Sequence, residues 1–308
     1  MLINVVNLKR YFGTTRAVDG LSFSFSEGQI YGFVGPNGAG KTTTMRVMAT
    51  LDEPTSGDVF FNGVSVVQDP EKARKMMGFV PDTLPTHRDM SVHEYIDFFA
   101  RAYGIRGNRR REVVESIEEF TNLMGIREKF LRALSKGMKQ RVNLARALVH
   151  DPPILVMYEP AAGLDPRARV ELRELVKVLA SQGKSILISS HILTELAEMI
   201  DGVVIIEQGK MLRAGTVKDI GKRVGACIVL FRVLDDPQQL CKDLLEMPHV
   251  EKVNLAGGFV RVAVTGEEEQ CCDLLKRVVE KGHRVAEFRE ESGSLEDVFM
   301  SVTKGEVQ

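Results

Sequence analysis

The first part of the chain shows apolar patterns that predict strands. Residues 2–8 and 21–25 alternate between apolar and polar side chains, which is typical of strands with one buried face. Residues 30–34 form a largely apolar run that ends in glycines, and a helical pattern follows over residues 45–51. We therefore expect a buried strand that leads through a glycine-rich turn into a helix.

Helical spacing of apolar residues then dominates from residue 91 to about residue 150. Strand-like apolar runs return at residues 154–157 and 186–189, with a helical pattern over residues 167–179 between them. Apolar strands joined through a helix indicate a parallel sheet that is covered on both faces. The chain is therefore predicted to have an α/β core with an inserted helical subdomain.

A different arrangement of elements begins after about residue 218. We expect strands at residues 226–233, 250–255, 260–264 and 285–289. Helices are expected at residues 237–245 and 268–281, with a further short helix near 295–302. The order β-α-β-β-α-β is the split βαβ arrangement. We predict a domain over residues 1–217, with its helical subdomain at about 88–148, and a small α+β accessory domain over 218–308.

Composition and charge exclude several classes of protein. Apolar residues make up 44% and charged residues 27%, with a formal net charge of −1, which is ordinary for a globular protein and gives no electrostatic reason to expect nucleic-acid binding. The four cysteines lack the spacing of a zinc site and are most simply reduced thiols. No signal peptide is apparent, and no apolar run approaches the roughly 20 residues that span a bilayer. If the protein serves a membrane, another chain is expected to span it.

The glycine-rich turn between the first buried strand and its helix matches a phosphate-binding motif. Gly35 to Thr42 fits G-x-x-x-x-G-K-[ST] in full, and the flanking strand and helix are the context that this motif requires. Glycines let backbone N–H groups approach phosphates closely, and the helix N-terminus adds a partial positive charge. Lys41 can reach the outer phosphates, and Thr42 can bind Mg²⁺. The sequence therefore predicts a nucleotide-binding loop.

Three later segments offer polar groups that could face the same nucleotide. Ser135 and Gly137 begin a helix, Glu159 follows the strand at 154–157, and His191 lies just beyond the strand at 186–189. A carboxylate at the carboxyl end of a parallel strand faces the ligand crevice of such a sheet. Taken alone, Ser135 is simply a helix cap, and a lone histidine is as often a surface residue as a functional one.

Together these motifs resemble the ATP-binding cassette family of membrane transporters. The matching segments are the loop at Gly35–Thr42, an LSGGQ-like signature at Leu134–Gln140, the pair Glu159-Pro160, the loop Gly163-Leu164-Asp165, and Ser189-Ser190-His191. The resemblance covers about residues 1–220 and implies a P-loop NTPase (RecA-like) fold. The C-terminal part, with Ser294 to Phe299, resembles the extension of multidrug and ABC-2-type exporter cassettes.

The resemblance also implies how the nucleotide is bound. Tyr11 would stack on adenine, although this aromatic residue could instead merely pack against the protein. Lys41 would hold the β- and γ-phosphates, Thr42 the Mg²⁺ and Thr43 an inner phosphate. The cofactor-binding candidates are Tyr11, Gly35, Asn37, Gly38, Gly40, Lys41, Thr42, Thr43, Ser135 and Gly137.

Catalysis and assembly follow from the same resemblance. Glu159 would orient or deprotonate the attacking water, and His191 would touch the γ-phosphate. Ser135 and Gly137 would close over ATP from the opposite protomer, so the site would form only in a head-to-tail homodimer or heterodimer. The implied partners are ATP, Mg²⁺ and a transmembrane permease on a separate chain, contacted through the helical subdomain. The expected location is the cytoplasmic face of the cell membrane, and the expected process is export.

Two residues depart from the family pattern. Tyr158 occupies the position of the aspartate that binds Mg²⁺, and a phenol is neutral at pH 7 and cannot replace a carboxylate for a hard cation. We therefore expect ATP binding to survive in weakened form and hydrolysis to be slow or absent, unless Thr42, phosphates and waters hold the metal well enough. Asp82 replaces a Gln or Glu with a shorter carboxylate and is a candidate catalytic and metal-binding residue, or else an ordinary surface aspartate.

Three functions remain open on the sequence. The first is an ABC-type ATPase subunit that drives a permease, and the second is a hydrolysis-impaired regulatory subunit that pairs with a competent cassette, which Tyr158 favours. The third is an ABC ATPase that acts on ribosomes or DNA. Proteins of that third class usually have two cassettes or a long coiled-coil insertion, and this chain shows one cassette with about 60 residues of helical insertion.

Overall fold

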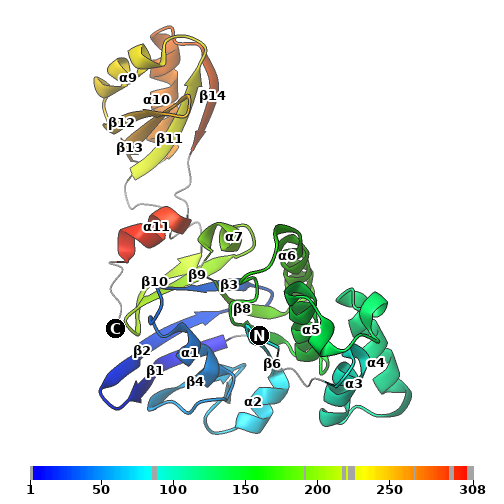
Figure 1. The fold of residues 1–308 in the computed structure, drawn as a ribbon. Helices are drawn as coiled ribbons and strands as arrows, with labels where there is room; N and C mark the ends of the chain where they lie inside the picture. The colour runs from blue at the N-terminus through cyan, green and yellow to red at the C-terminus, as the bar shows by residue number, and fades with distance from the viewer. Residues whose placement is uncertain are drawn as a thin grey trace. The chain divides into compact units, whose positions relative to one another are not determined.

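The computed structural model describes residues 3–84, 89–190, 192–216, 220, 226–266, 268–290 and 295–303 (Figure 1). The chain divides into two compact units. The larger unit comprises Met1–Thr216 with Val302–Gln308, and the smaller unit comprises Val217–Ser301. Each unit has a buried apolar core of its own, as a domain that folds around its own hydrophobic residues requires.

A six-stranded sheet forms the centre of the larger unit. Its strands lie in the order β10 (Lys210–Thr216), β9 (Gly202–Glu207), β3 (Ile30–Val34), β8 (Ser185–Ser189), β7 (Ile154–Met157) and β6 (Met77–Val80). Strand β3 is parallel to β8 and β9, and β7 is parallel to β6 and β8, whereas β10 pairs with β9 in the antiparallel sense. Strands β3, β7, β8 and β9 are buried along their whole length, because both faces of the sheet are covered. The predicted parallel sheet is confirmed.

A second, antiparallel sheet packs against this core. It contains β2 (Thr15–Phe25), β1 (Ile3–Phe12), β4 (Ser56–Phe61) and β5 (Val64–Ser65), in that order. Helix α1 (Lys41–Met48) contributes Met45 and Met48 to the same buried cluster as Phe33 of β3 and Phe61 of β4. The helix that follows the glycine-rich turn is therefore fixed by apolar contacts with both sheets.

Three more helices complete the α/β part of this unit. They are α2 (Pro70–Met76), α6 (Pro166–Ser181) and α7 (Leu193–Ala197). Helix α6 begins where Asp165 accepts a hydrogen bond from the Ala168 N–H at 2.8 Å, with Pro166 at the first helical position. Both residue types favour a helix start, which explains why α6 begins one residue before the predicted segment.

The predicted helical insertion is also present. It contains α3 (Val92–Ala102), α4 (Gly107–Phe120), the short 3₁₀ turns η1 (Met124–Ile126) and η2 (Leu131–Ala133), and α5 (Lys136–Leu148). A reciprocal pair of hydrogen bonds between Ser91 and Glu94 caps α3. Buried apolar residues such as Tyr95, Ile96 and Val142 form a separate core for these helices. Helices α3 and α4 lie at the opposite end of the unit from β1 and β2 (Figure 1).

The smaller unit has the predicted order of elements. These are β11 (Ala226–Val233), α9 (Pro237–Leu245), β12 (Val250–Ala256), β13 (Phe259–Thr265), α10 (Glu268–Glu280) and β14 (Val285–Glu290), followed by α11 (Leu295–Val302). The antiparallel sheet has the order β12-β13-β11-β14, so the two central strands are the first and third of the unit. Leu240 and Leu244 of α9 and Leu274 and Val278 of α10 pack on the sheet in one core. The split βαβ arrangement is confirmed.

Candidate functional site

The glycine-rich loop between β3 and α1 has a shape that only glycine permits at two positions. A Cβ atom on Gly35 would lie 2.4 Å from the carbonyl oxygen of Ile206, and one on Gly40 would lie 2.3 Å from that of Ala17. Gly40 also has φ of 101°, in the left-handed region that side chains disfavour. Neighbouring backbone therefore closes around the loop, and α1 begins immediately after Gly40 with the N–H groups of its first turn available to an anion.

Lys41 lies folded over this loop. Its side chain is only 6% exposed, and its ammonium group donates hydrogen bonds to the carbonyl oxygens of Gly35 at 2.6 Å and Pro36 at 3.0 Å. Burial lowers the pKa of Lys41, and the charge of Glu159 acts in the opposite direction. The ammonium group of Lys41 is therefore close enough to the carboxylate of Glu159, the predicted catalytic residue, for the two charges to interact.

The hydroxyl of Thr42 lies against Tyr158. Thr42 Oγ1 donates a hydrogen bond of 2.7 Å to the phenol oxygen of Tyr158, although the two residues are far apart in sequence. Tyr158 follows the last residue of β7, its backbone N–H donates to the Val80 carbonyl at 2.8 Å, and its side chain packs against the core of the larger unit. The side chain that replaces the expected aspartate therefore contacts the predicted metal ligand itself.

The donor set around Thr42 does not suit a resident Mg²⁺ of the kind that the family resemblance implies. Mg²⁺ prefers charged oxygen ligands in octahedral geometry, and a phenol supplies a neutral oxygen. Asp82, the second predicted ligand, is exposed in the segment after β6, and its carboxylate accepts a hydrogen bond from the Thr83 hydroxyl at 3.4 Å. Within the described part of the chain, no group of three or more His, Cys, Asp or Glu side chains could hold a metal ion.

Glu159 has an unusual backbone conformation. Its φ is 46°, in the left-handed region that costs a non-glycine residue about 1–2 kcal/mol. Its N–H donates to the hydroxyl of Ser189, the last residue of β8, at 3.0 Å, which fixes the turn after β7 against the next strand of the sheet. Strained backbone at the carboxyl ends of two parallel strands is typical of functional positions.

The other predicted phosphate-site residues have simpler settings. Asn37 and Gly38 are exposed on the loop, and Gly38 has φ of 79°. Thr43 is half-buried in the first turn of α1. His191 lies outside the described residues.

The signature segment forms a second open helix terminus. Ser135 caps α5, and its hydroxyl accepts a hydrogen bond from the Met138 N–H at 3.3 Å. Gly137 lies against α6, because a Cβ atom there would be 3.2 Å from Cβ of Ala168. Both residues line a cavity of about 330 Å³ together with Asp165, the cap of α6. Ser135 is exposed, so this helix terminus is accessible from outside the chain.

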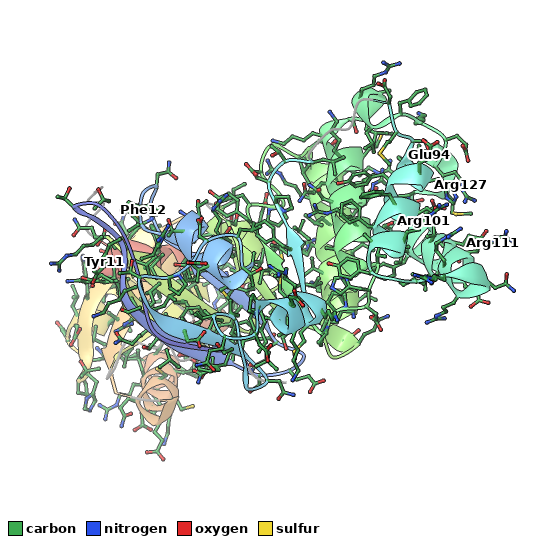
Figure 2. All side chains as sticks on the ribbon, turned by 90° about the horizontal axis from the view of Figure 1, so that it is seen from below. Tyr11, Phe12, Glu94, Arg101, Arg111 and Arg127 are labelled. Atoms are coloured by element: carbon green, nitrogen blue, oxygen red, sulfur yellow. The ribbon has the colours of Figure 1, made fainter. Side chains whose placement is uncertain are left out.

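Two adjacent aromatic residues end β1, and their environments differ (Figure 2). The hydroxyl of Tyr11 donates to Asp19 at 2.6 Å, which raises the pKa of the phenol, and the guanidinium of Arg16 lies 5.7 Å from its ring centre. Phe12 is 47% exposed, with Arg10 at 4.4 Å from its ring centre. The sequence analysis considered only Tyr11, but Phe12 is the more exposed of the two rings and offers the more accessible stacking surface.

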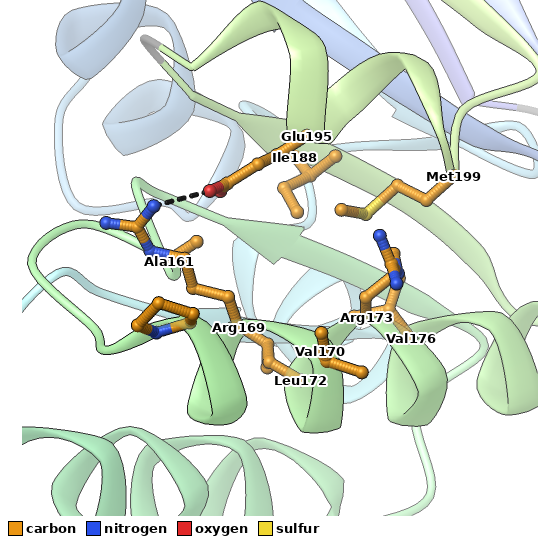
Figure 3. A pocket seen from close by; sticks show the side chains of 10 residues that line it. Ala161, Arg169, Val170, Leu172, Arg173, Val176, Ile188, Glu195 and Met199 are labelled. Atoms are coloured by element: carbon orange, nitrogen blue, oxygen red, sulfur yellow. Dashed lines mark hydrogen bonds and ion pairs between the residues drawn. The ribbon is translucent and has the colours of Figure 1, made fainter.

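A smaller cavity lies between α6 and α7 (Figure 3). Its volume is about 210 Å³, and its lining includes Val170, Val176, Ile188 and Met199. An ion pair of 2.6 Å between Arg169 and Glu195 joins the two helices across it. Among the described residues that line this cavity, none belongs to the glycine-rich loop, so we exclude it as the phosphate site.

These features define the class of protein. The loop lies between a parallel strand and a helix, neighbouring backbone packs closely against two of its glycines, and a buried lysine follows it. This arrangement is the phosphate-binding element of P-loop nucleotide-binding proteins. A family model described as "ABC transporter" matches residues 18–162, and one described as "ATP-binding protein DrrA1-3-like, C-terminal domain" matches residues 215–303.

Curated relatives match the chain over nearly its whole length. Nod factor export ATP-binding protein I of Rhizobium sp. (strain N33) is 33% identical over 306 residues, which cover 99% of this chain and 98% of the relative. Linearmycin resistance ATP-binding protein LnrL of Bacillus subtilis (strain 168) is 28% identical over 305 residues, with 98% of each covered. The chain belongs to the family of ABC transporter ATP-binding proteins.

Solved structures agree with this assignment. The ATP-binding subunit of an ABC transporter has a TM-score of 0.66 and 30% identity, covering 71% of this chain and 92% of its own. A nucleotide-free ATP-binding cassette has a TM-score of 0.63 and 25% identity, with 70% and 91% covered. The chain is therefore an ATP-binding subunit with the P-loop NTPase fold, from the ABC family of ATPases. No helix within the described ranges has the length and hydropathy of a membrane-spanning segment.

Proposed function

We propose that this subunit binds ATP at Gly35–Thr42 and thereby drives export through a permease on a separate chain. The observation that supports this most directly is the glycine-closed loop with Lys41 folded over it. Both curated relatives described above are named for export or resistance, and they match the chain through its smaller unit as well. The permease would place the protein at the cytoplasmic face of the membrane.

In this proposal the loop holds the phosphates and two other segments complete the site. The amides of Asn37, Gly38 and Gly40 and the ammonium group of Lys41 would hold the outer phosphates, and Thr43 would hold an inner one. Ser135 and Gly137 of a second cassette would approach from the opposite protomer. These two residues lie at an accessible helix terminus, as such an approach requires.

Hydrolysis in this proposal depends on Glu159, on His191 and on the position that Tyr158 occupies. Glu159 would position the attacking water, and His191 would contact the γ-phosphate. Phosphoryl transfer requires positioning and neutralisation of charge, and Tyr158 offers no charge at the position beside Thr42. At the predicted Mg²⁺ site the neutral phenol of Tyr158 stands beside Thr42 in place of a charged ligand, and Asp82 is the one predicted carboxylate, so we infer slow hydrolysis and assign no step to a metal.

Phosphate release by purified protein tests this inference. We expect the native chain to be slow with Mg-ATP and the Tyr158→Asp variant to be at least about tenfold faster, which corresponds to about 1.4 kcal/mol of the barrier. The double variant Tyr158→Asp with Glu159→Gln is the control, and it should lose the gain if the restored site performs the reaction. Brisk native turnover that Tyr158→Asp does not improve would contradict slow hydrolysis.

A second candidate function is a regulatory subunit that pairs with a hydrolytically competent cassette. The contact between Tyr158 and Thr42 favours it, because such a subunit can lack hydrolysis at its own loop and still supply Ser135 and Gly137 to its partner. Reconstitution with the permease and any second cassette separates the two candidates. If the heterodimer hydrolyses ATP and the Ser135→Arg variant abolishes this activity, the regulatory role is supported; activity of the homodimer with the permease alone supports the first.

A further inference from the structure

The hydroxyl of Tyr158 is fixed in space from several directions. Its oxygen accepts the 2.7 Å hydrogen bond from Thr42, its backbone is bonded to Val80 of the adjacent strand, and its ring packs against the core of the larger unit. Thr42 is the second residue of α1, directly after the lysine of the loop. The phenol oxygen therefore lies at the edge of the phosphate loop, at the place where the sequence pattern of the family would put a metal-binding carboxylate.

A phenol in this position can bind phosphate directly. When Thr42 donates its hydrogen to the Tyr158 oxygen, the phenol retains its own hydrogen for another acceptor. The oxygens of a nucleoside triphosphate are strong acceptors, and a hydrogen bond to a charged oxygen is about twice as strong as one between neutral groups. The ring of Tyr158 is half-buried, whereas its hydrogen bond with Thr42 is exposed, so a phosphate oxygen can reach the phenol from outside and would displace water there.

The charge balance of the loop also permits this substitution. A carboxylate together with a divalent cation adds one net positive charge, and a neutral phenol adds none. Replacing the pair by Tyr158 thus removes a single charge, while the buried ammonium group of Lys41 and the N-terminus of α1 remain. The oxygens around Thr42 are poor ligands for Mg²⁺, and the metal-free nucleotide, which carries four negative charges, needs no metal ligands. We therefore expect the loop to bind the metal-free form.

We propose that Tyr158 takes the place of the divalent cation, so that this cassette binds nucleoside triphosphate without metal and donates the Tyr158 hydroxyl to a phosphate oxygen beside Lys41. The inference rests on the proposed function, because it takes Gly35–Thr42 as the ATP site. It makes Tyr158 a specificity-determining residue that selects the metal-free form of the nucleotide.

Equilibrium binding of ATP to the full chain tests the inference, with excess MgCl₂ or with EDTA at matched ionic strength. We expect the native affinity to be at least as high in EDTA as in MgCl₂. The Tyr158→Asp variant should reverse this order and bind ATP at least about tenfold more tightly with MgCl₂ than with EDTA, because a carboxylate is a good ligand for Mg²⁺. Tyr158→Phe keeps the ring and removes the donor, so its affinity in EDTA should fall about tenfold.

Each outcome has a distinct meaning. Native binding that needs MgCl₂ overturns the inference and leaves the ATP site intact, as does a Tyr158→Phe variant that binds metal-free ATP as tightly as the native chain. Native protein that binds ATP in neither condition contradicts the proposed function itself. Tyr158→Phe keeps the ring that packs against the core, so it should unfold at the same temperature as the native chain, which separates loss of the donor from loss of the fold. Tyr158→Asp loses this packing, so it is judged by the order of its own two affinities and not by its unfolding temperature.

Discussion

Replacing Gly40 by alanine should distort the phosphate loop at a cost that the structure lets us divide into two parts. The left-handed φ of 101° costs alanine about 1–2 kcal/mol. The new Cβ would lie 2.3 Å from the Ala17 carbonyl, well inside the 3.0 Å that real Cβ atoms respect, and backbone there cannot move aside cheaply. Crowding of this kind costs about 1–3 kcal/mol, so the variant should lose about 2–5 kcal/mol of stability.

Gly63, in the turn between β4 and β5, provides a matched control. Its φ of 82° is also left-handed, but the structure describes no atom within 4 Å of a Cβ built there. Gly63→Ala should therefore lose only the conformational part, about 1–2 kcal/mol, and keep the ATP affinity of the native chain. Gly40→Ala should also weaken ATP binding, because the loop amides shift.

Urea unfolding of both variants and ATP titration measure these effects. A lower midpoint at unchanged slope reports the loss of stability in each variant. If Gly40→Ala loses no more stability than Gly63→Ala and binds ATP as tightly as the native chain, the close approach of Ala17 does not shape the loop, and the argument from it is refuted.

Further predictions concern adenine stacking and the smaller unit. ATP titration should show a loss of affinity of about 1–2 kcal/mol for Phe12→Ala and a smaller one for Tyr11→Ala, because Phe12 has the accessible ring; the reverse order would restore Tyr11 as the stacking residue. In the smaller unit, the hydrogen bond from buried His283 lowers the pKa of Asp243. His283→Ala should therefore lower the urea midpoint at pH 7, and this difference should shrink as the pH falls below about 4 through the lowered pKa; a difference that persists in acid would contradict the pairing.

Much of the fold could be predicted from the sequence, because the local patterns are strong and mutually consistent. Apolar runs at β3, β7 and β8 identified the parallel sheet, and the β-α-β-β-α-β order of segments identified the fold of the smaller unit. Boundaries were less certain. The helix after the loop begins at Lys41 rather than near residue 45, because its first turn consists of lysine and threonines that have no apolar periodicity, while its position is set by Gly40 and by packing of Met45.

The candidate site was predicted only as separate motifs. Ser135 as a helix cap is confirmed by its hydrogen bond to the Met138 N–H. The family resemblance placed Thr42 and Tyr158 at one metal site, but the hydrogen bond between their hydroxyls could not be predicted, because it joins the start of α1 to the end of β7 and exists only once the sheet is assembled. The left-handed φ of Glu159 could not be predicted either, because a glutamate gives no local signal for that backbone conformation.

Binding of ATP to the native chain and to Lys41→Met, measured by isothermal titration calorimetry in EDTA and in MgCl₂, tests the central claim most directly. The account predicts one nucleotide bound per native chain and a loss of affinity of about tenfold or more for Lys41→Met, which removes the charge and keeps the buried length of the side chain. Absence of heat from the native chain in both conditions, or equal affinity of the variant, would contradict it.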